Sequence, residues 1–541
     1  MYKRQTSGNT ALGWTAAENN TTGSINTAIG KQALRFNTTG AQNTAVGRNA
    51  MLQTTTGVNN TAIGFEALYT PTAVNDCTAV GYRALYANTT GAQNTAVGSG
   101  ALDANTTGDY NVAVGKNVLT TATGATGNTG IGWRCLEDAT GGYNTAVGYS
   151  AGLNISTGGF NTAIGTGALD ADTTGGYNTA VGYDSLGANT TASNNTSVGY
   201  NALKSNTTGT SHTAVGTNAL RDITTNSNCT AVGKDALKLN TASANTAVGF
   251  AAMEANTTGT NNVAIGEQAL ATNTTASHNT AVGYRAFYGG SSNGWGNTCV
   301  GRESGYDISS AWGCTLIGNE AGKNITTGQD NTCIGHNSAT SLTTGIQNTI
   351  VGVSAGNSLT TGISNVLLGM NAGTNQISTG SNQLYIARAG SAPGNDELWI
   401  YGNSVGACTQ GNNSSSWTTT SDQRLKKNIV DNSKGLAEIN QLRVTNFEYR
   451  KEDEIDMSEF PLADNPSQVV LGKGNEGVHT GVIAQEVESV LPECVEVSDR
   501  GTKTVKTDPI TWALVNAVKE LSAKNDALAA EVEQLKSQLN N

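Results

Sequence analysis

Residues 94–110 read NTAVGSGALDANTTGDY, and close variants of this 17-residue unit fill most of the chain. The core motif of the unit, Asn-Thr-Ala-Val-Gly, occurs 22 times, with its glycines at positions 13 to 369. Of the 21 spacings between these glycines, 18 are 17 residues, two are 16 and one is 18. A period this regular predicts a stack of equivalent turns, each contacting its two neighbours, as in a solenoid or fibre.

The composition of the unit predicts strands rather than helices. Helical repeats need roughly 30 or more residues for two helices, and they do not tolerate this much glycine and threonine. The Asn-Thr-Thr-Gly stretch is typical of a turn in which asparagine side chains bond to the local backbone. The glycine that closes the motif suits a position with a positive φ angle or a close backbone approach. We therefore expect a mainly β fold, a long parallel β-solenoid of 17-residue repeats.

Every copy has Val, Ile or Leu immediately before the motif glycine, as at Ile29, Val97 and Leu368. We expect this aliphatic side chain to point inward and to stack on its equivalents above and below, which would build a thin continuous core. The two alanines of the unit are small enough for a narrow interior, and stacked asparagines are able to form ladders along the axis. At one turn per ~4.8 Å of strand spacing, the 22 turns reach roughly 100 Å.

The period divides the chain into three parts. Residues 1–375 form the predicted rod, and residues 376–420 break the repeat as a stem or linker. This linker contains two predicted strands, 383–388 and 397–401, followed by a polar stretch that we expect to be extended and accessible to cleavage. Residues 421–541 have ordinary, charge-rich sequence, which predicts a small α+β domain that ends in a coiled-coil helix at about 512–541.

Charge and composition exclude several functions. The first 420 residues carry a net charge of −4 and the last 121 a net charge of −7, so we expect no nucleic-acid binding. No apolar run approaches the ~18 residues of a membrane span, and no N-terminal segment resembles a signal peptide, so we expect no membrane insertion. The eight cysteines have no metal-binding or disulfide spacing. We expect buried free thiols, no metal and no cofactor.

The boundary between the linker and the last part carries the clearest chemical signal. Residues 421–429 read SDQRLKKNI, which places the Ser421 hydroxyl next to the carbonyl group of Thr420. Attack on that carbonyl would be intramolecular and would gain from proximity. A serine hydroxyl needs a base, and a lysine serves if desolvation lowers its pKa toward neutrality. Lys426, five residues after Ser421, is a candidate for such a base, and the adjacent Lys427 is a second lysine, which a solvated surface position would explain.

The pattern Ser-Asp-x-Arg-Leu-Lys-x-x-Ile at 421–429 resembles the start of the intramolecular chaperone auto-processing domain of phage tailspikes and endosialidases. The resemblance extends over all 121 residues, with one departure at residues 507–509, where the family often has a tyrosine-containing strand end. Three further segments agree in order and distance, namely 436–449, 479–487 (His-Thr-Gly-Val-Ile-Ala-Gln-Glu-Val) and 517–521.

The resemblance implies self-cleavage. Such a domain trimerises, helps its passenger to fold and then cuts itself off at its own N-terminus, which here is the Thr420–Ser421 bond. It implies Ser421 as nucleophile and Lys426 as base. Asp422 is a candidate for orienting the turn or for pairing with a nearby arginine. His479 is either an assisting residue or a structural histidine at the start of a strand.

The rod resembles the heads of trimeric autotransporter adhesins and the repeat-built shafts of phage tail fibres. The leading hypothesis is a homotrimeric tail fibre of a virion, assembled in the host cytoplasm, that binds a glycan or protein receptor on the host cell surface. Other tail proteins are further candidate partners. Two alternatives stay open at this point, a bacterial trimeric surface adhesin with a solenoid head and a tailspike whose rod degrades polysaccharide.

The C-terminal helix has its own oligomerisation signal. Val at a positions, Leu at d positions and a seam asparagine, Asn525, favour a dimer by themselves. The resemblance implies a trimer, which we expect because the helix is short and the domain before it would dominate. The seam residues, spaced alternately four and three apart, are Leu514, Val518, Leu521, Asn525, Leu528, Val532, Leu535 and Leu539.

Overall fold

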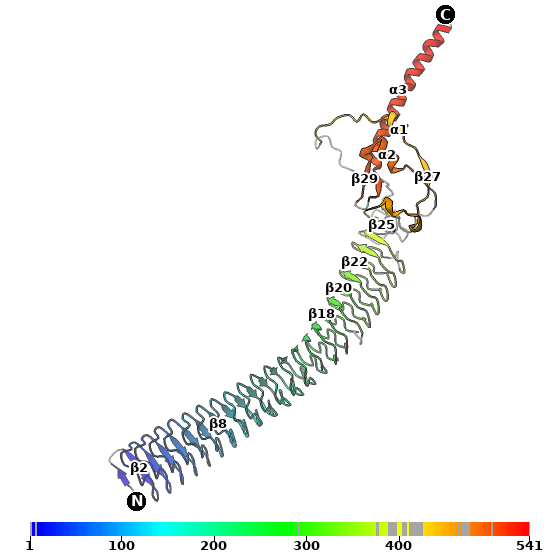
Figure 1. The fold of residues 1–541 in the computed structure, drawn as a ribbon. Helices are drawn as coiled ribbons and strands as arrows, with labels where there is room; N and C mark the ends of the chain where they lie inside the picture. Colours follow the sequence, from blue (N-terminus) through cyan, green and yellow to red (C-terminus); the bar gives the residue numbers. More distant parts are fainter. Residues whose placement is uncertain are drawn as a thin grey trace. The chain divides into compact units, whose positions relative to one another are not determined.

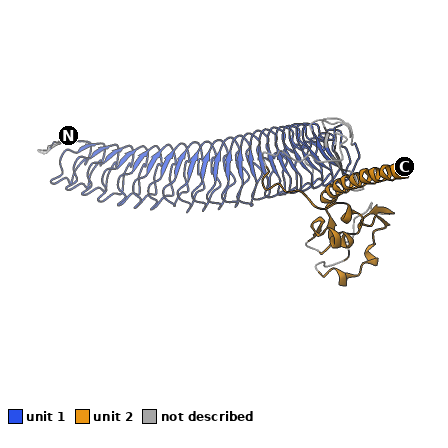
Figure 2. Cartoon of the chain, turned by 90° about the horizontal axis from the view of Figure 1, so that it is seen from above, with its two compact units in different colours: residues 1–402, 409–413 blue, residues 403–408, 414–541 orange. Residues whose placement is uncertain are grey.

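A computed structural model gives the fold of the chain (Figure 1). It falls into two compact units, residues 1–402 with 409–413 and residues 403–408 with 414–541 (Figure 2). The predicted boundaries at residues 375 and 420 lie outside the described residues and stay predictions. The described residues are 3–5, 8–289, 293–374, 378–387, 398–402, 408–410, 426–461, 466, 477–498 and 501–539.

The first unit is a parallel β-solenoid, as the 17-residue period predicts. Each of the 22 repeats contributes one strand, and consecutive strands pair in parallel with equivalent residues opposite each other, for example Thr44 opposite Thr61. The strands are β2 (Asn9–Leu12), β3 (Thr27–Ile29), β4 (Thr44–Val46), β5 (Thr61–Ile63), β6 (Thr78–Val80), β7 (Thr95–Val97), β8 (Val112–Val114), β9 (Thr129–Ile131), β10 (Thr145–Val147), β11 (Thr162–Ile164), β12 (Thr179–Val181), β13 (Thr196–Val198), β14 (Thr213–Val215), β15 (Thr230–Val232), β16 (Thr246–Val248), β17 (Val263–Ile265), β18 (Thr280–Val282), β19 (Thr298–Val300), β20 (Thr315–Ile317), β21 (Thr332–Ile334), β22 (Thr349–Val351) and β23 (Val366–Leu368).

Short strands close both ends of this sheet. β1 (Lys3–Gln5) pairs antiparallel with β2, and β24 (Leu384–Ala387) continues the parallel stack beyond β23. β25 (Leu398–Gly402) then pairs antiparallel with β24, which confirms the two strands predicted in this region. A further short strand, β26, spans Cys408–Gln410.

Backbone hydrogen bonds join each turn to the next. The Gly47 N–H donates to the Ile29 carbonyl at 2.7 Å, and the Thr44 N–H donates to the Asn60 carbonyl at 2.8 Å. The motif glycines lie where the backbones approach most closely. Gly148 has φ +140°, and a Cβ atom there would lie 2.6 Å from the carbonyl oxygen of Gly165 in the next turn. This confirms the predicted role of the glycine, because no other residue fits both the angle and the contact.

The prediction that the aliphatic residue before each glycine points inward is wrong. Ile63 is 41% exposed, whereas Ala62 beside it is fully buried. In a three-residue strand the middle side chain faces one side and its two neighbours face the other. The interior is so narrow that it takes the middle alanine and the leucine four residues after the glycine, such as Leu68. The predicted small-residue interior is therefore confirmed, and the Val, Ile or Leu lies on the outer surface.

Two ladders of buried asparagines run along the solenoid, as predicted. In the first, Asn43 Oδ1 accepts from the Asn60 N–H at 3.0 Å, and Asn43 Nδ2 donates to the Gly57 carbonyl at 2.8 Å. In the second, Asn105 Nδ2 donates to Asn88 Oδ1 at 3.0 Å in the preceding turn. The amides of the first ladder thus form hydrogen bonds with backbone groups that would otherwise be buried without partners.

Asp172 replaces an asparagine in the second ladder. Its Oδ1 accepts from the Gly175 N–H at 3.0 Å and from Asn189 Nδ2 at 3.1 Å. Its Oδ2 is buried without a hydrogen-bond partner, at the place where an asparagine has its donating Nδ2. Burial raises the pKa of Asp172 to about 6. A protonated Oδ2 would act as a donor as the amide does, so the site favours the neutral acid.

His212 replaces an asparagine in the first ladder and reproduces its hydrogen bonds. Its Nδ1 accepts from the Cys229 N–H at 3.3 Å, and its Nε2 lies 2.7 Å from the Asn226 carbonyl. This network assigns the proton of the neutral ring to Nε2. Burial lowers the pKa of His212, because a charged ring would lose hydration and the Nδ1 acceptor.

The cysteines of the repeat occupy similar small positions. Within the described part of the chain they are free and buried, as predicted, and burial raises the pKa of the Cys77 and Cys314 thiols to about 11. The buried repeat cysteines are Cys77, Cys135, Cys229, Cys299, Cys314 and Cys333.

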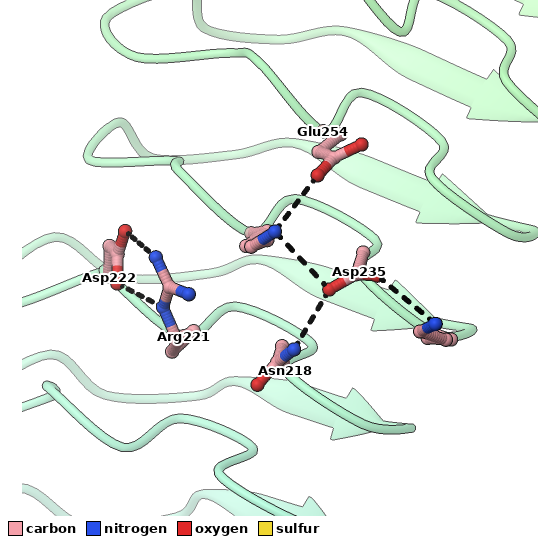
Figure 3. Close-up of polar contacts among 7 residues, drawn as sticks. Asn218, Arg221, Asp222, Asp235 and Glu254 are labelled. Atoms are coloured by element: carbon pink, nitrogen blue, oxygen red, sulfur yellow. Dashed lines mark hydrogen bonds and ion pairs between the residues drawn. The ribbon is translucent and has the colours of Figure 1, made fainter.

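Ion pairs and hydrogen bonds link turns on the outer surface of the rod. Asn218 donates to Asp235 at 2.9 Å, and Lys238 lies 3.6 Å from Asp235 and 3.0 Å from Glu254 in the next turn (Figure 3). These charges are paired within the chain.

The second unit combines short helices, two antiparallel strand pairs and the 33-residue helix α3. Its core contains Val487, Leu491 and Cys494, and within the described residues no helix is long and apolar enough to cross a membrane. The elements are α1 (Leu436–Ile439), β27 (Thr445–Phe447), η2 (Glu452–Glu454), η3 (Met457–Glu459), β28 (His479–Gly481), α2 (Ala484–Val490), η5 (Pro492–Cys494), β29 (Val495–Val497), β30 (Lys503–Val505) and α3 (Thr507–Leu539).

Replacing Asp172 by asparagine should stabilise the rod above pH 6. The raised pKa of Asp172 means that its stabilising contribution is present below about pH 3.8 and lost as the pH rises through about 6. We expect Asp172→Asn to raise the melting temperature at pH 8, because it should increase the free energy of unfolding by about 2–3 kcal/mol. The effect at pH 4 should be much smaller. The exposed Asp138→Asn is the control. An equal gain at both pH values would contradict the buried-acid interpretation.

Replacing His212 by asparagine should remove a loss of stability in acid. The lowered pKa of His212 means that its contribution is present above the unfolded value of about 6.5 and is lost as the pH falls through the folded value. Thermal melts of wild type and His212→Asn between pH 5 and 8 should therefore diverge as the pH falls. The exposed His278→Asn should follow wild type, and parallel curves for His212→Asn would reject the assignment.

Candidate self-cleavage site

Lys426 lies on the extended segment that leads to α1, and its side chain is exposed. Thr420, Ser421 and Asp422 lie outside the described residues. The pairing of Ser421 with Lys426 as nucleophile and base, and the role of Asp422, therefore stay predictions.

Helix α3 holds the segment that follows Lys426. Asn516 Nδ2 donates to the carbonyl oxygens of Asn432 and Lys434, both at 2.9 Å. The Leu436 N–H, at the start of α1, donates to Glu520 Oε2 at 3.3 Å. Two residues one helical turn apart on α3 thus bind the backbone of residues 432–436, between Lys426 and α1.

The start of α1 is fixed a second time by its own side chain. Glu438 Oε2 accepts from the Gly435 N–H at 2.9 Å, and this hydrogen bond lowers the pKa of Glu438. A carboxylate at the N-terminus of a helix is favoured because the first N–H groups of a helix have no partner within it. The start of α1 is therefore held both by Glu520 of α3 and by Glu438 of α1 itself.

His479 lies in a cluster of aromatic side chains. It opens β28, which pairs antiparallel with β27 so that His479 is opposite Phe447. The centroid of its ring lies 5.1 Å from that of Tyr449 and 6.2 Å from that of Phe447. These contacts are those of a structural histidine at a strand start, and an assisting role in cleavage stays a prediction.

The Gly-Val-Ile-Ala-Gln-Glu-Val segment, 481–487, forms the end of β28 and the start of α2. Val487 is fully buried in the core, and Glu486 on the same helix pairs with Arg443. The hydrogen bond from Arg443 lowers the pKa of Glu486. Because α2 leads directly into η5 and β29, this segment organises the packing of the domain.

A groove of about 700 Å³ lies over this packing. It is lined by residues of 447–450, 482–485 and 502–505, together with Ile455. Its walls combine aromatic and aliphatic side chains with the residues of strand β30. Among its lining residues Glu448 is the one carboxylate, and Arg450 and Lys503 are the basic side chains.

Part of the second unit matches a known protein family. Residues 421–496 match the family model described as chaperone of endosialidase, a peptidase family. The match begins at Ser421 and includes α1, α2 and both strands of the β27–β28 pair. A search of curated proteins gave no match. The matched chaperone domain together with the long solenoid fits a tail fibre or tailspike, and the family implies autoproteolytic chaperone activity.

The tether formed by Asn516 and Glu520 was not foreseen from the sequence. Both residues are polar residues of a helix whose apolar seam predicts oligomerisation. Their partners are backbone groups that lie 84 residues earlier in the sequence. Backbone partners leave no pattern in the sequence.

Asn516→Ala should slow self-cleavage. The change removes two hydrogen bonds, each worth about 1 kcal/mol, and so loosens the segment that carries Lys426. We expect cleavage about 5- to 30-fold slower on a denaturing-gel time course, with helix content unchanged by circular dichroism. Lys524→Ala, exposed on the same helix, should cleave as wild type does. Unchanged cleavage in Asn516→Ala would show that α3 does not position the junction.

Proposed function

We propose that this chain is a subunit of a phage tail fibre whose C-terminal domain assists the trimerisation and folding of the rod and then cuts the Thr420–Ser421 bond. The observation that carries the proposal is the start of the family match at Ser421, the residue that follows the repeat and its linker. The durable product is then the rod, and the last 121 residues serve its assembly.

In the proposed reaction Lys426, in its neutral form, takes the proton from the Ser421 hydroxyl. The Ser421 oxygen attacks the carbonyl carbon of Thr420, the peptide C–N bond breaks, and the Ser421 amine takes up the proton. Water then hydrolyses the resulting ester, which leaves a carboxylate on Thr420 and restores the Ser421 hydroxyl. The nucleophile and the reacting carbonyl belong to adjacent residues, so the first step needs no substrate binding.

The exposure of Lys426 has a consequence for when the reaction occurs. A lysine acts as a general base only in its neutral form, and removal of water from its amine favours that form. Association of the chaperone domains provides such a change in surroundings. We therefore infer that cleavage follows assembly, and that an unassembled chain keeps its chaperone.

Helix α3 supports the association of chains. Its seam side chains are exposed within the chain, with Leu514, Leu521, Leu528 and Leu535 between 49% and 57% exposed. An apolar row of this length on a solvent-exposed helix favours a coiled coil. We propose a homotrimer, in line with the family resemblance.

The rod is proposed to bind a glycan or protein receptor on the host cell surface, with other tail proteins as further partners. The proposed location is the virion, after assembly in the host cytoplasm. A long, stable solenoid provides the reach and the repeated exposed surface that such a role requires.

The dyad is tested by three variants. Ser421→Ala removes the nucleophile and Lys426→Ala the base, so both chains should stay full length on a denaturing gel under conditions in which wild type is cut completely. Lys427→Ala, the adjacent lysine, should be cut as wild type is. Normal cleavage of either the Ser421 or the Lys426 variant would remove that residue from the mechanism.

A further inference from the structure

Two stacked tryptophans lie on one corner of the rod, before the strands β19 and β20 of their turns. Trp295 and Trp312 occupy equivalent places in consecutive turns, since the Gly313 N–H donates to the Trp295 carbonyl at 3.2 Å. Their rings are parallel to within 3°, and the ring centroids lie 5.4 Å apart. The turn that holds Trp295 is also the one 18-residue repeat of the rod. The pair is therefore a local departure from an otherwise uniform corner.

The tryptophan pair is accessible from outside the rod. Trp295 is 54% exposed although Trp312 stacks against it, so much of its ring outside the stack is open to solvent. Among the residues that the structure describes, neither indole N–H has a hydrogen-bond partner. A tryptophan combines a large apolar ring with one polar N–H group. The pair thus offers a ligand both an apolar surface and two donors.

Glycines leave the flank of each ring without a side chain. Gly296 and Gly313 follow the two tryptophans, and both are in the left-handed region, at φ +67° and +69°. A Cβ atom added at Gly296 would meet no atom of the described residues within 4 Å, so the space beside Trp295 is open. A Cβ atom added at Gly313 would lie 2.5 Å from Asp330 Oδ1. A carboxylate therefore lies beside Trp312, next to the open space.

Asp330 is an exposed acceptor that has no hydrogen-bond or ion-pair partner in the described part of the chain. Basic side chains of nearby turns are bound elsewhere, because Arg302 lies 2.9 Å and Lys323 2.7 Å from the carboxylate of Glu303. A carboxylate in this state binds hydroxyl or N–H groups through charge-assisted hydrogen bonds, and it repels anions. The corner therefore favours a ligand that is rich in donors and carries no negative charge.

The stack of Tyr288 and Tyr306 on the same rod provides a contrast. Its ring centroids lie 5.1 Å apart. Arg285 lies over Tyr288 at 5.2 Å from the ring centroid, and Lys323 lies over Tyr306 at 6.0 Å. Cations of the chain itself thus occupy the surface of that stack, and its polar surroundings are satisfied internally.

We propose that the tryptophan corner, formed by Trp295, Gly296, Trp312, Gly313 and Asp330, binds a neutral oligosaccharide of the host cell surface. The inference rests on the proposed receptor-binding role of the rod and names the class of ligand. The C–H groups on one face of a sugar ring carry partial positive charge and pack against the negative face of an indole ring. Hydroxyl groups of the sugar donate to Asp330 and accept from the indole N–H groups. Sites for small ligands combine such an aromatic surface with a few polar groups.

The size of the corner favours an oligosaccharide over a single sugar and over a protein. Trp295 and Asp330 lie two turns apart, which is about 10 Å along the axis at the ~4.8 Å spacing of strands. An extended sugar chain reaches both residues. With a width of about 10 Å, the corner offers roughly 100 Å², far below the about 800 Å² that each partner of a stable protein complex buries.

A glycan array tests the inference with the full-length protein as the labelled probe. The array carries neutral oligosaccharides beside sialylated and sulphated ones, and wild type should bind neutral members. Trp295→Ala removes the accessible ring, so binding should weaken about tenfold or more. Gly296→Asn fills the open space and should weaken binding as well.

The Gly296→Asn chain should keep the fold. Asparagine adopts the same left-handed conformation at the equivalent position of other turns, at Asn194 with φ 63° and at Asn228 with φ 64°. Tyr110→Ala is the matched control, because Tyr110 is an exposed aromatic residue at that position of another turn, 61% exposed. It should bind the array as wild type does.

Self-cleavage and native mass, measured on the same samples, separate this inference from the proposed function. Binding of neutral glycans that both corner variants weaken and Tyr110→Ala does not is the expected result. Wild type that binds only acidic glycans or none, or corner variants that bind as wild type does, would overturn the tryptophan corner as a glycan site. If those chains still assemble and cut at Thr420–Ser421, the proposed fibre stands with another receptor or another site. Chains that neither assemble nor cut would reject the fibre itself.

Discussion

The close approach of consecutive turns at the motif glycines is the constraint on which the rod depends. At Gly148 the backbone adopts φ +140° directly above the carbonyl of Gly165, and the same arrangement recurs along the solenoid. A side chain at any of these positions would force the turns apart and break the hydrogen bonds on either side. The glycine column therefore sets both the spacing and the register, and the asparagine ladders follow because equivalent residues come to lie directly over one another.

The narrow interior explains why aliphatic side chains lie on the outer surface of the rod. A turn this tight fills its interior with small residues and one or two large ones, such as Leu220 and Ile223, and the aliphatic residue at the end of each strand is left outside. Stability comes from repeated hydrogen bonds along the axis rather than from a wide core. Asp172 and His212 show the limits of this scheme, since each fits its ladder in only one protonation state.

Much of the fold could be predicted from the period, because a 17-residue repeat rich in Gly, Asn and Thr permits few structures. The direction of the aliphatic residue could not. A three-residue strand has one side chain on one face and two on the other, and the sequence does not say which face is inside; Ala62 and Ile63 were distinguished by the space available, not by their hydrophobicity. At the junction, Ser421 and Lys426 are predictions from motif and chemistry, whereas the hydrogen bonds from Asn516 to the backbone depend on the tertiary fold.

The rod and its chaperone have unequal roles in this account. In the proposed function the C-terminal domain brings the chains together while the rod forms, and it is then removed. Native mass spectrometry of the wild-type protein tests this most directly, because it reports the cut and the assembly in one spectrum. Trimers of residues 1–420 and a separate fragment that begins at Ser421 are expected. A single intact species of 55.4 kDa would contradict it.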